Sequence, residues 1–344
     1  MSAVSLRLSA LVVTLAVTAA ACSSSSDQVV LLTHDSFALS EETLASFTED
    51  TGIEVVIQFA GDAGTMLNQA ILTKDNPIAD VMFGVDNTFL SRAIDNGIFA
   101  PYEAVDISSV SSTIRVQGDF ATPIDFGDVC VNYDIAALDK AGIAAPQNLG
   151  DLTDPAYRDL LVVEDPALSS PGLAFLMATI AEYPDGASYD WKAYWSDLFD
   201  NGVAVSANWT EAYTSRFSRS GGDRPLVVSY ASSPPAEVLF GELDEAPTGI
   251  MTNGCFRQIE FAGVLAGTDN EKAARLFIDF LLARTTQEDI PLNMFVYPVN
   301  DQAKLPDVFS EFTTLPQNPV VTEPGTIEAN RERWIREWTT IARS

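Results

Sequence analysis

The strongest constraint in this 344-residue sequence is an alternation of strand and helix patterns near its beginning. The apolar run Val29–Leu32 is followed by an amphipathic helical pattern between Ser40, a favourable N-cap residue, and Gly52. The alternating run Ile53–Phe59 comes next, and Ala79–Gly84 is a third strand pattern. Strand, helix and strand in this order form the unit of a parallel sheet with helices on its faces. The sequence therefore predicts an α/β fold.

Each of these three strands is followed by a polar turn that contains an aspartate, namely Asp35, Asp62 and Asp86. The carboxyl ends of parallel strands lie along the same sheet edge, where open α/β sheets bind their ligands. We therefore expect the three carboxylates to converge on one crevice.

A second group of candidate site residues lies between positions 202 and 233. Val203–Ser206 and Leu226–Tyr230 are short strand patterns, and Trp209 and Tyr230 fall where strands give way to loops. Aromatic side chains at such places either contact a ligand or fill the core, and the pattern leaves both open.

The later part of the chain predicts a second domain. The extended segments Asp119–Tyr133 and Ile250–Phe261 are expected to cross between the domains, and Tyr189–Asp200 is an amphipathic helix whose aromatic residues we interpret as packing. Ser170 as N-cap and Pro171 at the first helical position predict a helix start. Such a start favours an anion, although capping alone also explains these residues.

The N-terminal residues have the features of an export signal. Met1–Ala21 contains one arginine ahead of an apolar run that is too short to span a bilayer. Small residues before Cys22 resemble the lipobox of bacterial lipoproteins, in which the cysteine is acylated. Residues 22–27 form a Ser-rich spacer. We therefore expect a lipoprotein anchored at the outer face of the cell membrane, or a periplasmic protein.

The chain has a formal net charge of −29, which makes nucleic acid and anionic lipid poor partners. Such a charge favours cationic ligands, although solubility alone also explains it. If Cys22 is acylated, Cys130 and Cys255 remain as an even pair in an oxidising compartment. We predict a disulfide between neighbouring strands, the alternative being two buried free thiols.

The sequence gives little support for catalysis. His34 is the only histidine, and its neighbours Asp35 and Ser36 cannot form a relay with it because adjacent side chains do not reach one another in that geometry. Nucleophile-elbow, phosphate-loop and zinc-protease motifs are absent from the sequence, and no loop has the oxygen spacing of a calcium site. Binding is therefore the better hypothesis, with an anchored hydrolase as the less favoured alternative.

Six ordered motifs resemble those of the thiamine-binding, lipid-anchored components of bacterial thiamine ABC importers. These are Asp35–Phe37, Ala79–Asn87, Ser170–Gly172, Trp209–Tyr213, Ser229–Pro234 and Tyr297–Val299. The resemblance implies a type II periplasmic-binding-protein fold, with residues 28–121 and 258–290 in one domain and residues 122–257 and 291–344 in the other. It implies hinges near Thr122 and Gln258 and one ligand in the cleft.

The resemblance also implies how the cleft binds its ligand. Trp209, Tyr230 and Phe295 would stack on the thiazolium cation, and Asp62 or Asp86 would accept hydrogen bonds from the aminopyrimidine. Ser169, Ser170 and the Gly172 amide would receive the hydroxyl or phosphate arm. The full implied set is Asp35, Asp62, Gly64, Asp86, Ser169, Ser170, Gly172, Trp209, Tyr230, Ser232 and Phe295. The implied protein is a monomer without a cofactor or metal, whose partners are the permease and its ATPase.

Three positions depart from the family pattern. Ala236 and His34 stand where the family often has tyrosine, and Phe295 stands where it has tryptophan. A smaller, less polar cage is expected to bind more weakly or to prefer a related pyrimidine. The alternative ligand within binding proteins is another small cation, such as a polyamine or a metal ion. If His34 lines the cleft, its protonation is expected to weaken cation binding.

Overall fold

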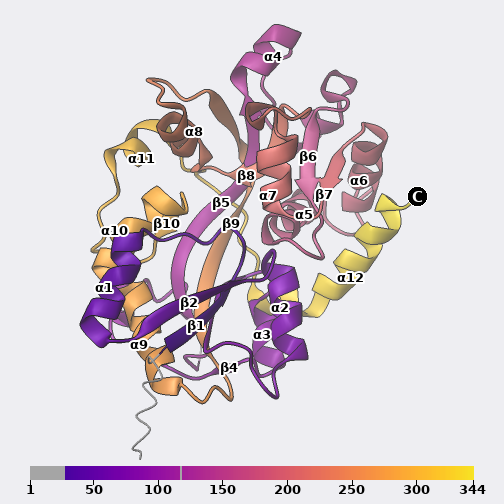
Figure 1. Ribbon diagram of the computed structural model, residues 1–344. Helices are drawn as coiled ribbons and strands as arrows, with labels where there is room; N and C mark the ends of the chain where they lie inside the picture. The colour runs from indigo at the N-terminus through magenta and orange to yellow at the C-terminus, as the bar shows by residue number, and fades with distance from the viewer. Residues whose placement is uncertain (1–27, 117) are drawn as a thin grey trace, which may run out of the picture.

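The computed structural model describes residues 28–116 and 118–344 (Figure 1). The expected leader, Cys22 and the serine spacer lie outside the described residues. Within the described part of the chain, no helix combines the length and the apolar character needed to cross a membrane.

The strands of the described chain form one sheet, whose main path runs β2-β1-β3-β9-β5-β8-β6-β7, with β4 paired to β9 and β10 paired to β5. Their bounds are β1 (Gln28–Thr33), β2 (Glu54–Phe59), β3 (Val81–Asp86), β4 (Phe99–Ala100), β5 (Thr122–Asp134), β6 (Leu161–Glu164), β7 (Ala204–Ser206), β8 (Leu226–Tyr230), β9 (Thr248–Leu265) and β10 (Tyr297–Pro298). Strand β1 is parallel to β2 and β3, which confirms the parallel sheet predicted from the first 90 residues.

The sheet consists of two parallel halves joined by two long antiparallel strands. We refer to β2, β1 and β3 as the first half and to β8, β6 and β7 as the second half. Strands β5 and β9, the predicted crossing segments, pair along their length and join the halves (Figure 1). A disulfide between Cys130 and Cys255 links these neighbouring strands, as predicted.

Helices cover both halves of the sheet. They are α1 (Glu41–Thr51), α2 (Ala63–Leu72), α3 (Leu90–Asp95), α4 (Ile135–Ala141), α5 (Ser170–Glu182), α6 (Trp191–Asp200), α7 (Trp209–Glu211), α8 (Ser233–Gly241), α9 (Glu271–Leu282), α10 (Arg284–Asn293), α11 (Asp307–Phe312) and α12 (Pro324–Ala342). A π-helical turn, Ala212–Arg216, continues α7. Short 3₁₀ turns lie at Ile107–Ser109, Leu149–Thr153, Pro155–Tyr157 and Ser218–Ser220.

The helix ends confirm some of the predicted caps and correct others. The Ser40 hydroxyl accepts from the Thr43 N–H at 3.1 Å, as expected of an N-cap. Helix α5, however, is capped by Ser169 and not by Ser170, because the Leu173 N–H already bonds the Ser169 carbonyl and places Ser170 inside the first turn. Helix α9 ends at Leu282, since extended backbone at residue 283 separates it from α10.

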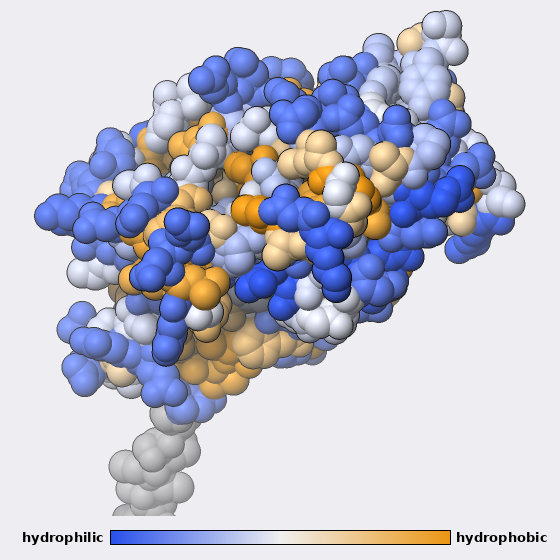
Figure 2. Space-filling model, turned by 90° about the horizontal axis from the view of Figure 1, so that it is seen from above, coloured by the Kyte–Doolittle hydropathy of each residue, from blue (hydrophilic) through white to orange (hydrophobic). Residues whose placement is uncertain are grey.

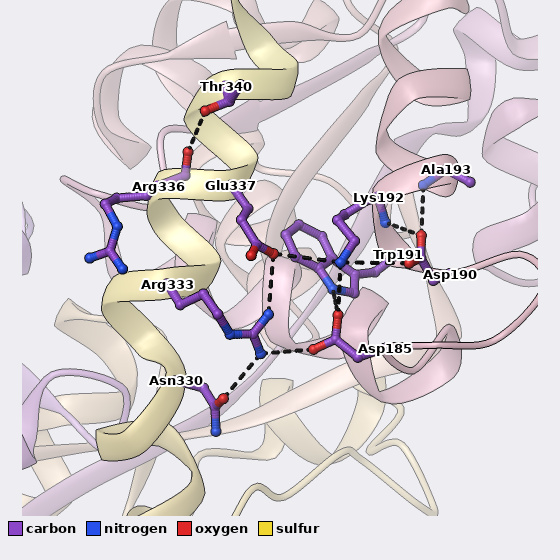
Figure 3. Close-up of polar contacts among 10 residues, drawn as sticks. All are labelled: Asp185, Asp190, Trp191, Lys192, Ala193, Asn330, Arg333, Arg336, Glu337 and Thr340. Atoms are coloured by element: carbon purple, nitrogen blue, oxygen red, sulfur yellow. Dashed lines mark hydrogen bonds and ion pairs between the residues drawn. The ribbon is translucent and has the colours of Figure 1, made fainter.

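Helix α12 contacts both sides of the molecule. The buried Trp191 and Trp195 of α6 fill the core, as predicted, and Trp338 of α12 packs edge-on against Trp195. At the surface, Arg333 of α12 pairs with Asp185 at 2.8 Å (Figure 3). The buried Arg331 of α12 also donates to the carbonyl of Thr88, just before α3. The C-terminal helix therefore ties α6, beside the second half of the sheet, to α3, beside the first.

Candidate functional site

A cavity of about 490 Å³ lies between the strand ends of the first half and the helices of the second. This volume is in the range of small-molecule sites. Figure 2, in which the molecule is seen from above, shows several apolar patches among hydrophilic residues. The lining side chains come from the loops after β1 and β2, the start of α5, α7 and its π turn, α8, β9 and residues 293–296.

His34, directly after β1, forms the floor of the cavity with Glu260 of β9. The His34 Nε2 atom lies 3.5 Å from Glu260 Oε1. Gly84 makes this placement possible because it lacks a side chain: a Cβ there would lie 2.1 Å from the His34 ring. Gly84 lies in a bulge of β3 and has a φ of 97°, which glycine adopts without strain. Burial lowers the pKa of His34, but the neighbouring carboxylates, Glu260 above all, outweigh burial and raise it above 6.5.

Asp62 connects the two sides of the cavity. It begins α2 on one side, and its Oδ2 accepts the backbone N–H of Trp209 from the other at 3.1 Å. Burial raises the pKa of Asp62, although the Ser169 hydroxyl, the Trp209 N–H and His34 act to lower it. Its neighbour Asp35 accepts the Gly61 N–H at 2.9 Å, which holds the loops after β1 and β2 together.

Trp209 is held in place from several directions. The preceding Asn208 caps α7 by accepting the Glu211 N–H at 2.8 Å. The indole ring stacks on Tyr213 with centroids 5.0 Å apart and planes 18° apart, and its Nε1 donates to Ser229 at 3.0 Å. The aromatic face at the cavity is therefore preorganised.

Two further aromatic residues line the cavity. Tyr230, at the end of β8, accepts a hydrogen bond on its hydroxyl from Gln258 at 3.0 Å. Its ring fits against Gly127 of β5, where a Cβ would lie 2.7 Å from the ring. Phe295 has a left-handed backbone (φ 54°), and its carbonyl accepts from the Ser232 hydroxyl at 2.6 Å. This bond fixes the strained turn that presents the Phe295 ring.

Three more carboxylates are buried behind the cavity wall. Asp86 is fully buried and accepts from the Thr88 hydroxyl at 2.7 Å, and burial raises its pKa to about 7. Burial also raises the pKa values of Asp125 and Glu164 well above the ordinary range. The region around the cavity is therefore strongly acidic in composition, and burial raises the pKa of three of its carboxyl groups.

The structure brings together six of the eleven residues expected at the site. The cavity lining includes Asp35, Asp62, Ser170, Trp209, Tyr230 and Phe295. The other five, Gly64, Asp86, Ser169, Gly172 and Ser232, lie outside the lining and support it from behind. The three aspartates after the strands therefore converge only in part, since Asp86 points to Thr88.

Two of these five residues, Gly64 and Gly172, support the site by allowing close packing of backbone. The Gly64 N–H bonds the Leu168 carbonyl at 3.0 Å, and a Cβ at residue 64 would lie 2.7 Å from that oxygen. A Cβ at Gly172 would lie 2.5 Å from the Glu164 carbonyl. These glycines thus allow α2 and α5 to pack closely against neighbouring backbone.

Several lining residues were not predicted from the sequence. They are chiefly Tyr213, Glu237, Phe240, Glu260 and Met294. The four-residue spacing of Trp209 and Tyr213 could have indicated rings on one helix face. A glutamate inside the apolar run from Ile259 to Leu265 could have indicated Glu260. Glu237 and Phe240 had no comparable signal, because α8 was not predicted.

The sequence matches the family model for bacterial extracellular solute-binding proteins over residues 76–314. The chain belongs to this family. The solute-binding protein is 29% identical to the thiamine-binding periplasmic protein of Escherichia coli K12 over 314 residues, which cover 90% of this chain and 92% of that protein. It is 28% identical to the protein of the same name from Brucella abortus, with 91% of both chains covered.

Solved structures agree with this assignment. A periplasmic thiamin binding protein superposes on this solute-binding protein with a TM-score of 0.82 and 26% identity, covering 91% of this chain and 96% of that one. A ferric binding protein from Campylobacter jejuni shares the fold at 17% identity, with a TM-score of 0.71. The predicted two-domain periplasmic-binding-protein fold is therefore confirmed.

Proposed function

We propose that this solute-binding protein captures thiamine or a thiamine phosphate outside the cytoplasm and delivers it to the permease of an ABC importer. The observation that supports this most directly is the composition of the cavity, which is lined by both aromatic rings and carboxylates. The thiamine-binding names of its relatives point the same way.

The chemistry of thiamine suits this cavity. Its thiazolium ring carries a permanent positive charge, which the faces of Trp209 and Tyr230 attract by about 0.5–2 kcal/mol each, depending on desolvation. Its aminopyrimidine donates hydrogen bonds, and one to a carboxylate such as Asp62 contributes roughly 1.5–3 kcal/mol. Phe295 and Phe240 supply further apolar surface at the cavity wall. We propose a binding role without catalysis or a cofactor.

The test is calorimetry of the purified protein against thiamine, spermidine and ferric citrate. We expect heat and a one-to-one stoichiometry with thiamine, and at least tenfold weaker binding of spermidine and iron. Spermidine has charge but no ring, so the comparison isolates the contribution of the aromatic faces. Tight binding of spermidine or iron with no response to thiamine would show that the cavity takes another cation.

We also propose that the two halves close over the ligand by bending of β5 and β9, near Thr122 and Gln258. Closure sequesters the ligand and presents a shape to the permease. Small-angle scattering with and without thiamine tests this, because closure reduces the radius of gyration. An unchanged scattering profile at saturating ligand would contradict it.

For the N-terminus we propose export, cleavage before Cys22 and acylation of that cysteine, so that a monomer remains tethered to the outer face of the membrane. Mass spectrometry of the protein from membranes should show an N-terminal peptide with lipid on Cys22. A Cys22→Ala variant should be released into the medium or periplasm. If the unaltered protein were released in the same amount, the proposed lipid anchor at Cys22 would be wrong.

A further inference from the structure

We propose that the buried Arg331 of α12 favours reopening of the two halves, because its guanidinium group has few partners while the halves are in contact and would regain water as they separate. This inference rests on the proposed function and on the proposed bending of β5 and β9. It assigns a role in ligand release to a residue that lies outside the cavity lining.

The two halves contact each other beside the cavity. From the second half, the Trp209 N–H donates to Asp62 at the start of α2, at 3.1 Å. From the first half, the Gly64 N–H donates to the carbonyl of Leu168, just before α5, at 3.0 Å. Separation of the halves would break both hydrogen bonds, so we refer to this arrangement as closed.

Helix α12 is attached to the second half by a hydrophobic and an ionic contact. Trp338 packs edge-on against the buried Trp195 of α6, with ring centroids 5.4 Å apart. Arg333 pairs with Asp185, which precedes α6, at 2.8 Å, and Glu337 of α12 also accepts from Arg333 (Figure 3). We therefore expect α12 to move with α6 when the halves separate.

Arg331 reaches from α12 to the first half, next to the proposed bend in β9. Its Nη1 atom donates to the Thr88 carbonyl and to the Ser91 hydroxyl, each at 3.3 Å. The adjacent Asn87 forms two hydrogen bonds with Ile259 of β9, both at 3.0 Å. Because hydrogen bonds are lost beyond roughly 3.5 Å, a shift of α3 away from α12 by about 1 Å would release Arg331.

The guanidinium group is buried in the closed arrangement but incompletely paired. Arg331 is 5% exposed, and its Nε atom has no hydrogen-bond partner among the described residues. Its contact with a carboxylate is weak, since Nη2 lies 3.6 Å from the exposed Glu332. Burial lowers the pKa of Arg331, and the positive charge of Arg92 acts in the same direction. Glu332 and Asp95 act in the opposite direction but do not outweigh burial. The surroundings therefore disfavour the charge of Arg331.

A buried charge with too few partners costs free energy that is recovered when water reaches it. If α3 moves away from α12, the N–H groups of Arg331 become hydrated, so the charge penalises the closed arrangement and not the open one. The apparent affinity for a ligand falls with the fraction of the protein in the binding-competent arrangement. We therefore expect Arg331 to weaken ligand binding from outside the cavity and to ease release.

Removing the charge of Arg331 tests the inference. Arg331→Met keeps a long apolar side chain, and apolar replacement of a buried charge is often neutral or stabilising. Calorimetry of the purified protein at pH 7.5 should give a Kd for thiamine at least about threefold lower than that of the unaltered protein, because a larger fraction is closed. Small-angle scattering without ligand should give a smaller radius of gyration for the same reason.

Two further variants make the test specific to Arg331. Arg333→Met is the matched control, because it makes the same change two residues further along α12 and breaks a contact within the second half. It should leave both Kd and the radius of gyration unchanged. Ser91→Asp places a carboxylate of the first half beside Arg331 Nη1, and the better-paired charge should also lower Kd. This second variant tests the inference if Arg331→Met does not fold.

An unchanged or higher Kd in Arg331→Met would overturn the inference, as would an equal fall in Kd in Arg333→Met. A gain in the free energy of unfolding of Arg331→Met without a change in Kd or radius of gyration would also overturn it, because the charge would then affect folding alone. Absence of thiamine binding by the unaltered protein would overturn the proposed function, whereas the ligand-free radius of gyration would still test the effect of Arg331.

Discussion

Replacing Trp209 by alanine removes the best-organised aromatic face of the cavity. The indole is fixed by its stack on Tyr213, 5.0 Å between centroids, and by the 3.0 Å bond from Nε1 to Ser229. A desolvated cation over such a ring gains about 0.5–2 kcal/mol, and loss of the ring also removes apolar contact with the ligand. We therefore expect Trp209→Ala to weaken thiamine binding by more than about 1.4 kcal/mol, a tenfold rise in Kd.

Part of the effect of this substitution falls on stability and not on binding. Loss of the Trp209–Tyr213 stack should lower the free energy of unfolding by about 0.5–1.5 kcal/mol in addition to the loss of buried area. Urea denaturation without ligand measures that part, and calorimetry of the folded protein measures Kd. The backbone N–H of residue 209 donates the hydrogen bond to Asp62, so the alanine variant can still form it.

Two further variants separate the ring from its hydrogen bond. Trp209→Phe keeps an aromatic face but loses the donor to Ser229, so Kd should rise less than in Trp209→Ala. Trp334→Ala removes a buried tryptophan of α12 outside the cavity, and it should destabilise the protein while leaving Kd unchanged. An unchanged Kd in Trp209→Ala would refute the reasoning, because the ring would then not face the ligand.

Three other predictions concern pH, the disulfide and one glycine. Thiamine affinity should fall as pH decreases from about 8 to 5, because His34, whose pKa is raised above 6.5, gains positive charge in that range. Calorimetry should show a flatter dependence of affinity on pH for His34→Gln. A flat dependence for the unaltered protein would contradict this prediction. Replacing both Cys130 and Cys255 by serine should lower the free energy of unfolding by about 2–5 kcal/mol in guanidinium titrations. Two reactive thiols in the unreduced, unfolded protein would show that the disulfide is absent. Gly84→Ala should displace the His34 ring and weaken thiamine binding. Gly52→Ala, also at positive φ but with open space around it, should lower only the stability of the protein. Equal Kd values for both variants would exclude the steric role of Gly84.

Much of the fold could be predicted because its signals are local. The strand and helix patterns from Val29 to Gly84 identified the first half of the sheet, and Ser40 was recognisable as a cap from its residue type. The cap of α5 was placed one residue too late, since Ser169 and Ser170 are equally good caps and only the hydrogen bond from Leu173 distinguishes them.

The candidate site was predictable only in part. Residues at strand ends, such as Asp62, Trp209 and Tyr230, follow from the rule that α/β sheets bind ligands at that edge. Glu260 lies in the middle of β9, and Glu237 lies on a helix that begins with two prolines. The apolar neighbours of Glu260 are its only local signal, and Glu237 has no local pattern that relates it to a cavity.

The sequence by itself determined many of the strands and helices and the large negative charge of the chain, because periodicity and charge are properties of neighbouring residues and of composition. Only the tertiary structure decided which carboxylates face the cavity and which are buried behind it. Asp62 and Asp86 follow equivalent strands, yet one accepts the N–H of Trp209 from across the cavity and the other turns to Thr88. That choice depends on contacts between residues up to 147 positions apart, which no local pattern contains.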